Sequence, residues 1–272
     1  MSFFKDFEHE WVQKQEFEKV ETTQLLAIAA QEIQEAPKNK PLAWVFDLDS
    51  TLFCTGPRNK RVFWKFLQKQ ENFPKHWMLA WNQLSPQSQE YGVPKTFFKL
   101  FREQGWSEAE AQNEARHLWE SYREHWMEEF FLSSNMAYDP PYEGAVKFVQ
   151  SLYDLGYDVV YLTGRDEPRA LEGTIHALKA ANFPMGDRTH VRLKPSQDMA
   201  DLDFKTRAAE RLNSEFSVRA LMDNEPENLV MFAEFFEFAH IVFFHSIMSP
   251  RVPDTDIRKP LGQRRLYLLD HF

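Results

Sequence analysis

The feature that most constrains this chain is the stretch 42–52, in which five consecutive apolar residues run directly into acidic and hydroxyl side chains. Such an apolar run is typical of a strand buried on both faces of a parallel sheet. Asp47 and Asp49 follow it, and like charges this close cost free energy unless a cation or a shared proton offsets them. In open parallel α/β sheets, ligands bind beyond the carboxyl ends of the strands. We therefore expect a functional site here rather than only an Asx-type turn.

Length and composition narrow the class of protein. A chain of 272 residues suits one large domain or a core with an insertion. The formal charge of -9 argues against a general nucleic-acid binder, which normally has a basic face. The only cysteine, Cys54, excludes an intramolecular disulfide and fits a reducing compartment. Because no apolar run is long enough to cross a bilayer and the start is too acidic for a signal peptide, we expect a cytoplasmic protein.

Strands and helices are expected to alternate on both sides of a more irregular middle region. Residues 5–35 have the apolar spacing of a helix in two pieces, before the buried strand. After residue 138, further strands are expected at 158–165, 189–193, 218–223 and 239–245, with helices at 144–155, 167–182, 203–212 and from 226 onward. This alternation predicts an α/β fold with a parallel sheet.

The middle region, 61–138, has helical spacing and many aromatic residues. Ser107 followed by Glu110 resembles a capping box at the start of a helix over 107–131. Helical spacing also occurs at 62–70 and 96–104. An aromatic stripe at helical spacing is usually core, but a small helical insert can hardly bury all of its tryptophans. We therefore expect some of them to line a cleft.

Three later segments contain groups that suit phosphate chemistry. Thr163 and Gly164 end a strand, where a hydroxyl and a glycine amide can donate to phosphoryl oxygens. Asp223 ends another strand. Lys205 lies near a helix start, where its charge opposes the helix dipole, which hints at another use. Lys194 competes for the same role.

These residues resemble the motifs of the haloacid dehalogenase (HAD) superfamily of phosphohydrolases. Residues 47–51 match its Asp-x-Asp-x-Thr motif. The resemblance implies that Asp47 is the nucleophile that forms an aspartyl-phosphate and that Asp49 is the general acid and base. It also implies phosphate binding by Thr163, Gly164 and Lys205. Mg²⁺ would be held by Asp47, the Asp49 backbone carbonyl and Asp223, with Asn224 and Glu227 both open as the further fourth-motif residue.

The resemblance also implies an architecture, a three-layer Rossmann-like α/β core with a parallel sheet and an inserted α-helical cap. The core would comprise residues 41–57 and 139–272, the cap residues 58–138, and an N-terminal helical extension residues 1–40. Gly56 and Pro57 are expected to form a turn rather than continue a helix. Arg58 and Lys60 beyond it either face an anionic substrate or are solvated loop charges. The tail from residue 246 is expected to be a wrapping extension.

The resulting functional prediction is a Mg²⁺-dependent phosphatase acting on a small phosphorylated substrate. A phosphotransferase such as a mutase uses the same residues and stays open. A phosphatase of nucleic-acid ends is disfavoured by the acidic charge. A catalytically idle interaction module is the remaining alternative, and the intact set Asp47, Asp49, Thr163, Lys205 and Asp223 argues against it.

Overall fold

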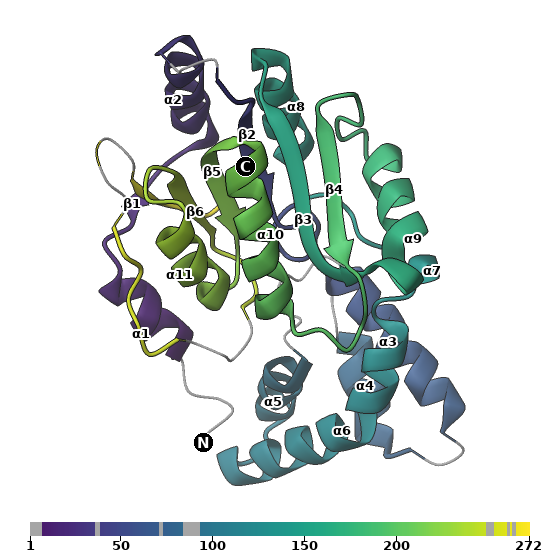
Figure 1. The fold of residues 1–272 in the computed structure, drawn as a ribbon. Coiled ribbons are helices and arrows are strands. Elements are labelled where there is room, and N and C mark those ends of the chain that lie inside the picture. The colour runs from purple at the N-terminus through teal and green to yellow at the C-terminus, as the bar shows by residue number, and fades with distance from the viewer. Residues whose placement is uncertain are drawn as a thin grey trace.

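The fold is an α/β architecture around a single parallel sheet. The computed structural model describes residues 7–35, 39–70, 73–83, 93–248, 253–259, 262 and 265–272. Its seven strands all run parallel, in the order β1-β7-β6-β5-β2-β3-β4 (Figure 1). They are β1 (Glu18–Lys19), β2 (Leu42–Phe46), β3 (Asp158–Asp166), β4 (Thr189–Lys194), β5 (Ser217–Asp223), β6 (His240–Phe244) and β7 (Leu266–Leu269). The prediction of a Rossmann-like parallel sheet is confirmed.

Strand β2 lies at the centre of the functional part of the sheet. It pairs with β3 on one side and with β5 on the other, and Phe46 lies opposite both Tyr161 and Met222. Because all three strands are parallel and in this register, the residues that follow them reach the same edge of the sheet. That edge is where Asp47 begins its turn.

Alternate side chains of the strands face two separate apolar layers. Trp44 and Phe46 pack with the helices α2 (Thr22–Glu35), α8 (Ala145–Leu155) and α9 (Glu167–Ala180). Ala43 and Val45 pack with α1 (Phe7–Lys14), α10 (Asp201–Glu215) and α11 (Pro226–Phe235). Two helical layers with the sheet between them give the predicted three layers, and the continuous apolar run of β2 is explained by burial on both faces.

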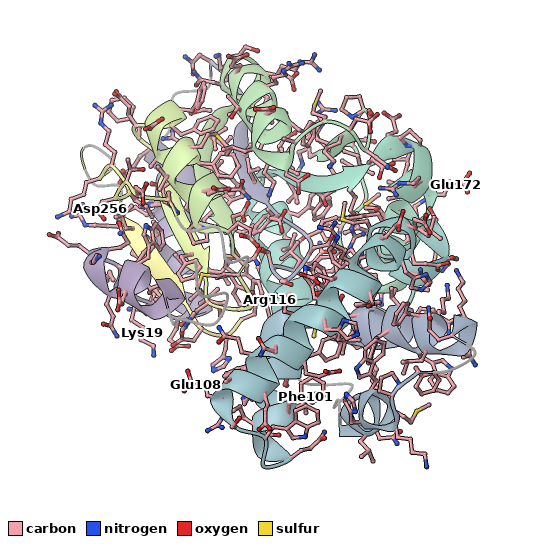
Figure 2. All side chains as sticks on the ribbon, turned by 90° about the horizontal axis from the view of Figure 1, so that it is seen from below. Lys19, Phe101, Glu108, Arg116, Glu172 and Asp256 are labelled. Carbon is pink, nitrogen blue, oxygen red and sulfur yellow. The ribbon has the colours of Figure 1, made fainter. Side chains whose placement is uncertain are left out.

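The segment between β2 and α8 is helical among its described residues and lies beyond the carboxyl ends of the strands (Figure 1). Its helices are α3 (Gly56–Lys69), α4 (Lys75–Gln83), α5 (Val93–Glu103), α6 (Glu108–Glu129) and α7 (Ser133–Met136). Ser107 caps α6 in a capping box with Glu110, as predicted. In the view from below, Phe101 lies near the start of α6, which is marked by Glu108 (Figure 2).

The tryptophans of this segment are divided between its core and its surface. Trp77 is buried, whereas Trp64, Trp106, Trp119 and Trp126 are partly buried and pack against the same aromatic cluster. The Trp126 indole N–H donates to Asn59 Oδ1 at 2.7 Å. The side chain of Trp81 lies outside the described residues. The expectation that a small insert cannot fully bury all its tryptophans is therefore met by those described.

Two expectations about local structure are corrected, and the expected division of the N-terminal helix into two pieces is confirmed. Gly56 and Pro57 do not form a turn but begin α3, because a proline is tolerated in the first turn of a helix. The tail is not only a wrapping extension, since its β7 pairs with β6 and with β1. Strand β1 lies between the two N-terminal helices, and its backbone pairs with that of β7. Within the described residues, no helix combines the length and apolar character needed to span a membrane.

Candidate active site

Three residues far apart in the sequence meet at the carboxyl edge of the sheet. Lys205 Nζ lies 2.7 Å from Asp47 Oδ1 and 2.7 Å from Asp223 Oδ2. All three side chains are buried. The Asp47 backbone N–H donates to the Met222 carbonyl at 2.9 Å, which extends the pairing of β2 with β5 and places the two acids side by side. One ammonium group between two carboxylates offsets part of their repulsion.

The turn after β2 holds the acids in a tight loop. The backbone N–H groups of Leu52 and Phe53 both donate to the Leu48 carbonyl, and Ser50 N–H donates to the Phe53 carbonyl at 2.8 Å. Ser50 has a φ of 62°, in the left-handed region. For a residue other than glycine this conformation costs on the order of 1 kcal/mol, and such strain is concentrated at functional sites.

Asp49 meets a separate set of partners. Its Oδ1 is bonded by both Arg58 and Arg165, and the distance from Arg165 Nη2 is 2.6 Å. Arg165 Nε also donates to Asp49 Oδ2 at 3.1 Å. Behind the arginines lies Asp139, whose Oδ2 is 2.9 Å from Arg58 Nη2 and 3.4 Å from Arg165 Nη2. We call Asp49, Arg58, Arg165 and Asp139 the Asp49 network.

The two acids of the motif therefore have opposite electrostatic environments. Burial raises the pKa of Asp47 to about 7, against the opposing effect of Lys205, and the charge of Asp223 adds to the rise. Burial also favours a higher pKa for Asp49, but Arg165 and Arg58 outweigh it and hold that pKa below its usual range. Burial opposes the charge of Lys205, yet Asp223 and Asp47 raise the pKa of the ammonium group overall. Lys205 thus stays charged.

Thr163 and Gly164 lie in an irregular stretch of β3. The pairing of β3 with β4 shifts between Leu162 and Asp166, a break of the kind often found next to active sites. The Arg165 backbone N–H donates to Thr163 Oγ1 at 3.3 Å, so the hydroxyl proton of Thr163 is left to donate elsewhere.

The surroundings of Gly164 show that the two candidate lysines bind different acids. A Cβ atom on Gly164 would lie 2.7 Å from Asp201 Oδ2, so the carboxylate of Asp201 fits against a glycine only. Lys194 Nζ is bound to the same carboxylate at 2.6 Å from Oδ1. Lys194 is therefore paired with Asp201, whereas Lys205 is the lysine that meets Asp47.

The fourth motif is arranged differently from either sequence candidate. Asn228 Nδ2 donates to both oxygens of Asp223, at 3.2 and 3.0 Å, and the Glu225 backbone N–H donates to Oδ1 at 2.8 Å. Asn224 turns away, because its Oδ1 accepts from Thr51 Oγ1 at 3.0 Å. Glu227 lies in the first turn of α11, and no hydrogen bond among the described residues joins it to Asp223.

Sequence reasoning missed part of this site. Asp139 was not a candidate, although it stands directly before two prolines where the chain returns to the sheet. From the sequence, Arg165 could pair with phosphate or with its neighbour Asp166, but Asp166 is paired with Arg169 and Arg165 binds Asp49. Asn228 was missed because its position five residues after Asp223 holds an amide rather than an acid.

The donors near Lys205 fit a magnesium ion. Mg²⁺ prefers oxygen ligands and usually takes one or two carboxylates together with water and substrate phosphate. Asp47 and Asp223 already direct an oxygen each at one cation, the Lys205 ammonium. Among the described residues no three His, Cys, Asp or Glu side chains form a ready-made metal cage, as this sparse ligand set leads one to expect. The chemistry of the donor set therefore agrees with Mg²⁺.

Part of the chain is similar to a known protein family. Residues 114–230 match the model described as HAD superfamily, subfamily IIIB (acid phosphatase). The match covers less than half of the chain, and over this segment the chain is similar to that family of phosphatases. The matched segment contains Thr163, Lys205 and Asp223 and begins after Asp47 and Asp49.

Solved structures resemble this chain at low sequence identity. A predicted phosphatase from Clostridium acetobutylicum is 16% identical, with 76% of this chain and 86% of that chain covered and a TM-score of 0.43. A hydrolase from Pseudomonas syringae is 14% identical, with 85% and 94% covered and a TM-score of 0.41. The class C acid phosphatase from Bacillus anthracis with tungstate bound is 16% identical, with 76% and 60% covered and a TM-score of 0.39. No curated protein matches the sequence.

Proposed function

We propose that this protein is a phosphatase of the HAD superfamily that hydrolyses a small phosphate monoester with Mg²⁺ through an aspartyl-phosphate on Asp47. The observation that carries the proposal is the position of Lys205 Nζ, 2.7 Å from both Asp47 and Asp223 at the carboxyl edge of the sheet. A buried ammonium group so placed neutralises a nucleophilic carboxylate and an incoming phosphoryl group together.

The proposed reaction has two displacements. First, an Asp47 Oδ atom attacks phosphorus and the bond from phosphorus to the leaving oxygen breaks. Arg58 and Arg165 keep Asp49 ionised in the free protein, so Asp49 takes a proton from the monoanionic phosphate ester and passes it to the leaving oxygen. Then water attacks phosphorus, Asp49 takes the proton from the water, and the bond from Asp47 to phosphorus breaks to release inorganic phosphate. Thr163, Gly164 and Lys205 hold the non-bridging oxygens during both steps.

In this proposal Asp47, the Asp49 backbone carbonyl and Asp223 hold Mg²⁺. The ion, when bound, supplies positive charge that offsets the negative charge of the phosphoryl group. Asn228 supports Asp223 through the two hydrogen bonds from its amide. Asn224 and Glu227, the earlier candidates, have no part in this assignment.

We further propose that residues 58–138 form a cap over the core of residues 41–57 and 139–272, after the N-terminal extension of residues 1–40. The position of α3 to α7 beyond the carboxyl ends of the strands supports this division (Figure 1). A cap in this position excludes water and selects the substrate. The free thiol of Cys54 is buried, which suits the reducing conditions of a cytoplasmic location.

The proposal is tested by hydrolysis of 4-nitrophenyl phosphate with added Mg²⁺, with EDTA, and with Mg²⁺ restored after EDTA. We expect activity that is lost in EDTA and recovered with Mg²⁺. Undiminished turnover in EDTA would contradict the metal assignment.

The variant that tests the role of Asp47 is Asp47→Asn, which keeps the shape of the side chain but removes the nucleophile. We expect turnover to fall by about 10⁴-fold or more, with no phosphorylated protein detected by mass spectrometry after rapid acid quench. Phosphate found on Asp49 of the wild-type protein would contradict the assigned roles.

A further inference from the structure

The side chains of the Asp49 network are ordered by depth. The Asp49 side chain is 22% exposed, whereas those of Arg58, Arg165 and Asp139 are 0% exposed. The arginines therefore lie behind Asp49, and Asp139 lies with them rather than at the surface. In this arrangement Asp49 is the member that a substrate can meet.

Asp139 is the residue that holds the two arginines together. Arg58 reaches it twice, with Nε 3.1 Å from Oδ1 and Nη2 2.9 Å from Oδ2. Arg165 Nη2 lies 3.4 Å from the same Oδ2. A planar guanidinium group bound in this way has a fixed direction, because its five N–H donors form a rigid fork.

The other contacts of each arginine agree with this direction. Arg58 Nη1 donates to the Phe130 carbonyl at 3.1 Å, and its guanidinium lies 3.9 Å from the centre of the Phe130 ring. Arg165 Nη1 donates to Thr174 Oγ1 at 3.1 Å. With these contacts made, the Nη2 atoms of both arginines are left to converge on Asp49 Oδ1.

The network also joins three separate segments of the chain. Arg58 belongs to α3, Arg165 to β3, and Asp139 to the segment where the chain returns from the helical insert to the sheet. Arg58 and Arg165 are 81 and 26 positions from Asp139, so tertiary packing rather than a local turn brings the three side chains together.

We propose that Asp139 is a positioning residue that sets the location of the Asp49 carboxyl group by fixing Arg58 and Arg165. This inference rests on the proposed function, in which Asp49 transfers a proton to the leaving oxygen. Asp139 does not meet the substrate. Its effect is confined to how well Asp49 is aimed.

The consequence is a selective effect on substrates with poor leaving groups. A displaced Asp49 cannot reach the leaving oxygen, and only a poor leaving group depends on that proton. The value of kcat/KM reports the first displacement, so the later attack of water does not obscure the comparison.

The test is a comparison of phenyl phosphate with 4-nitrophenyl phosphate for the variant Asp139→Asn, with Mg²⁺ present. The two esters are similar in shape, but phenolate is the poorer leaving group. We expect kcat/KM to fall by about tenfold or more for phenyl phosphate and by less than about threefold for 4-nitrophenyl phosphate. An equal loss for both esters, or no loss, would overturn the positioning role.

Two further variants make the result decisive. Asp158→Asn is the control, because Asp158 is also a buried and paired carboxylate, 2.7 Å from His190 at the other end of β3, and it should leave the ratio of the two esters unchanged. If Asp139→Asn does not fold, the same comparison is made with Arg58→Lys. Lysine keeps the positive charge, but its single ammonium group cannot bind both Asp49 and Asp139 as the guanidinium group does. This variant should show the same selective loss, and an unchanged ratio would overturn the proposal. Wild-type protein that hydrolyses neither ester would overturn the proposed function, and this inference with it.

Discussion

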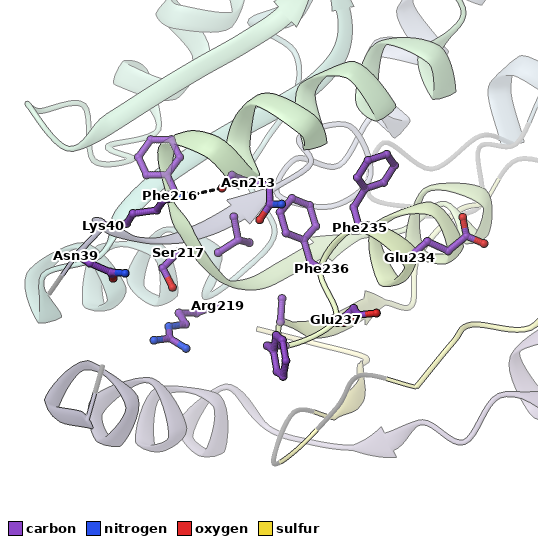
Figure 3. A pocket seen from close by; sticks show the side chains of 13 residues that line it. Asn39, Lys40, Asn213, Phe216, Ser217, Arg219, Glu234, Phe235, Phe236 and Glu237 are labelled. Atoms are coloured by element: carbon purple, nitrogen blue, oxygen red, sulfur yellow. Dashed lines mark hydrogen bonds between the residues drawn. The ribbon is translucent and has the colours of Figure 1, made fainter. Parts of the chain in front are cut away.

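The carboxyl and amino edges of this sheet contain the ends of the same strands but differ sharply in buried charge. At the carboxyl edge, Asp47, Asp223 and Lys205 lie within one set of ion pairs, and the Asp49 network adds two arginines. At the amino edge a hollow of about 460 Å³ is lined by the start of β5 and the loop before β6. Lys40 there donates to the Asn213 carbonyl at 2.9 Å, and both side chains are exposed (Figure 3).

The difference shows where this fold accepts the cost of buried charge. Removing charged groups from water costs several kcal/mol for each ion, and ion pairing does not reliably recover it. At the amino edge the buried His240 of β6 avoids this cost, since burial lowers its pKa to about 4 and it is neutral at pH 7. The carboxyl edge retains buried charges despite this desolvation cost, which indicates that they serve catalysis rather than stability.

Among variants that keep the nucleophile, the largest effect should come from Asp49→Asn at the carboxyl edge. This change removes the proton donor and the base, so turnover should fall by about 10²–10⁴-fold. With 4-nitrophenyl phosphate the nucleophile can still react, and an aspartyl-phosphate on Asp47 should accumulate and be seen by mass spectrometry. Full turnover without a trapped phosphoenzyme would place the acid and base elsewhere.

The two lysines sharpen the comparison within one edge. Lys205→Ala should lower kcat/KM by about 10²–10³-fold, because it leaves Asp47 and Asp223 without their shared cation. Lys194→Ala removes a lysine that is paired with the half-exposed Asp201 and should cost less than about tenfold. The measurement is kcat/KM of both variants with one substrate. A larger loss for Lys194→Ala than for Lys205→Ala would show that Lys194 is the catalytic lysine.

Asn228→Asp tests the amide that binds Asp223 in the fourth motif. A second carboxylate beside Asp223 should raise the apparent affinity for Mg²⁺ by about tenfold, because affinity for hard cations grows with ligand charge. Without metal, the two acids repel and the donated hydrogen bonds are lost, so the melting temperature in EDTA should fall. The measurement is thermal unfolding across a Mg²⁺ titration, with Asn228→Ala as the control that loses the hydrogen bonds without gaining charge. Equal metal affinity in all three proteins would separate Asn228 from the metal.

The smallest effect should come from the amino edge and should concern stability alone. His240 is neutral in the folded state, with a pKa lowered to about 4 by burial, against about 6.5 when unfolded. The unfolded chain therefore binds more protons between these values, so the contribution is complete above about pH 6.5 and is lost as pH falls toward 4. Its full size is on the order of 3 kcal/mol.

Urea unfolding of the wild type and His240→Asn at pH 7.5 and 4.5 measures this contribution. Asparagine can still accept from the Arg265 backbone N–H, which now donates to His240 Nδ1 at 3.0 Å, so the pH dependence should shrink while kcat is unchanged. Glu32 lies 3.3 Å from Nε2, and Arg219 and Arg265 lower the pKa further. An undiminished pH dependence in the variant would show that Glu32 retains the proton-linked effect.

The local features of this protein could be predicted from its sequence. The apolar run of β2, the two acids after it and the alternation of strands and helices identified a parallel sheet and its functional edge, because burial on two faces leaves a continuous apolar pattern. The capping box of α6 was equally visible, since its two residues are three positions apart. The tail strand β7 was not, because a strand of four residues has too little pattern of its own.

The tertiary structure alone decided which opposite charge each charged side chain of the site pairs with. Lys205 and Asp47 are 158 positions apart, and only the pairing of β2 with β5 and the docking of α10 bring them together while Lys194 goes to Asp201. The sequence also contains no sign that Arg165 bonds Asp49 rather than Asp166. The physical reason is that charged side chains pair with whatever opposite charge the packing brings within reach, and that depends on strand order and register rather than on neighbours along the chain.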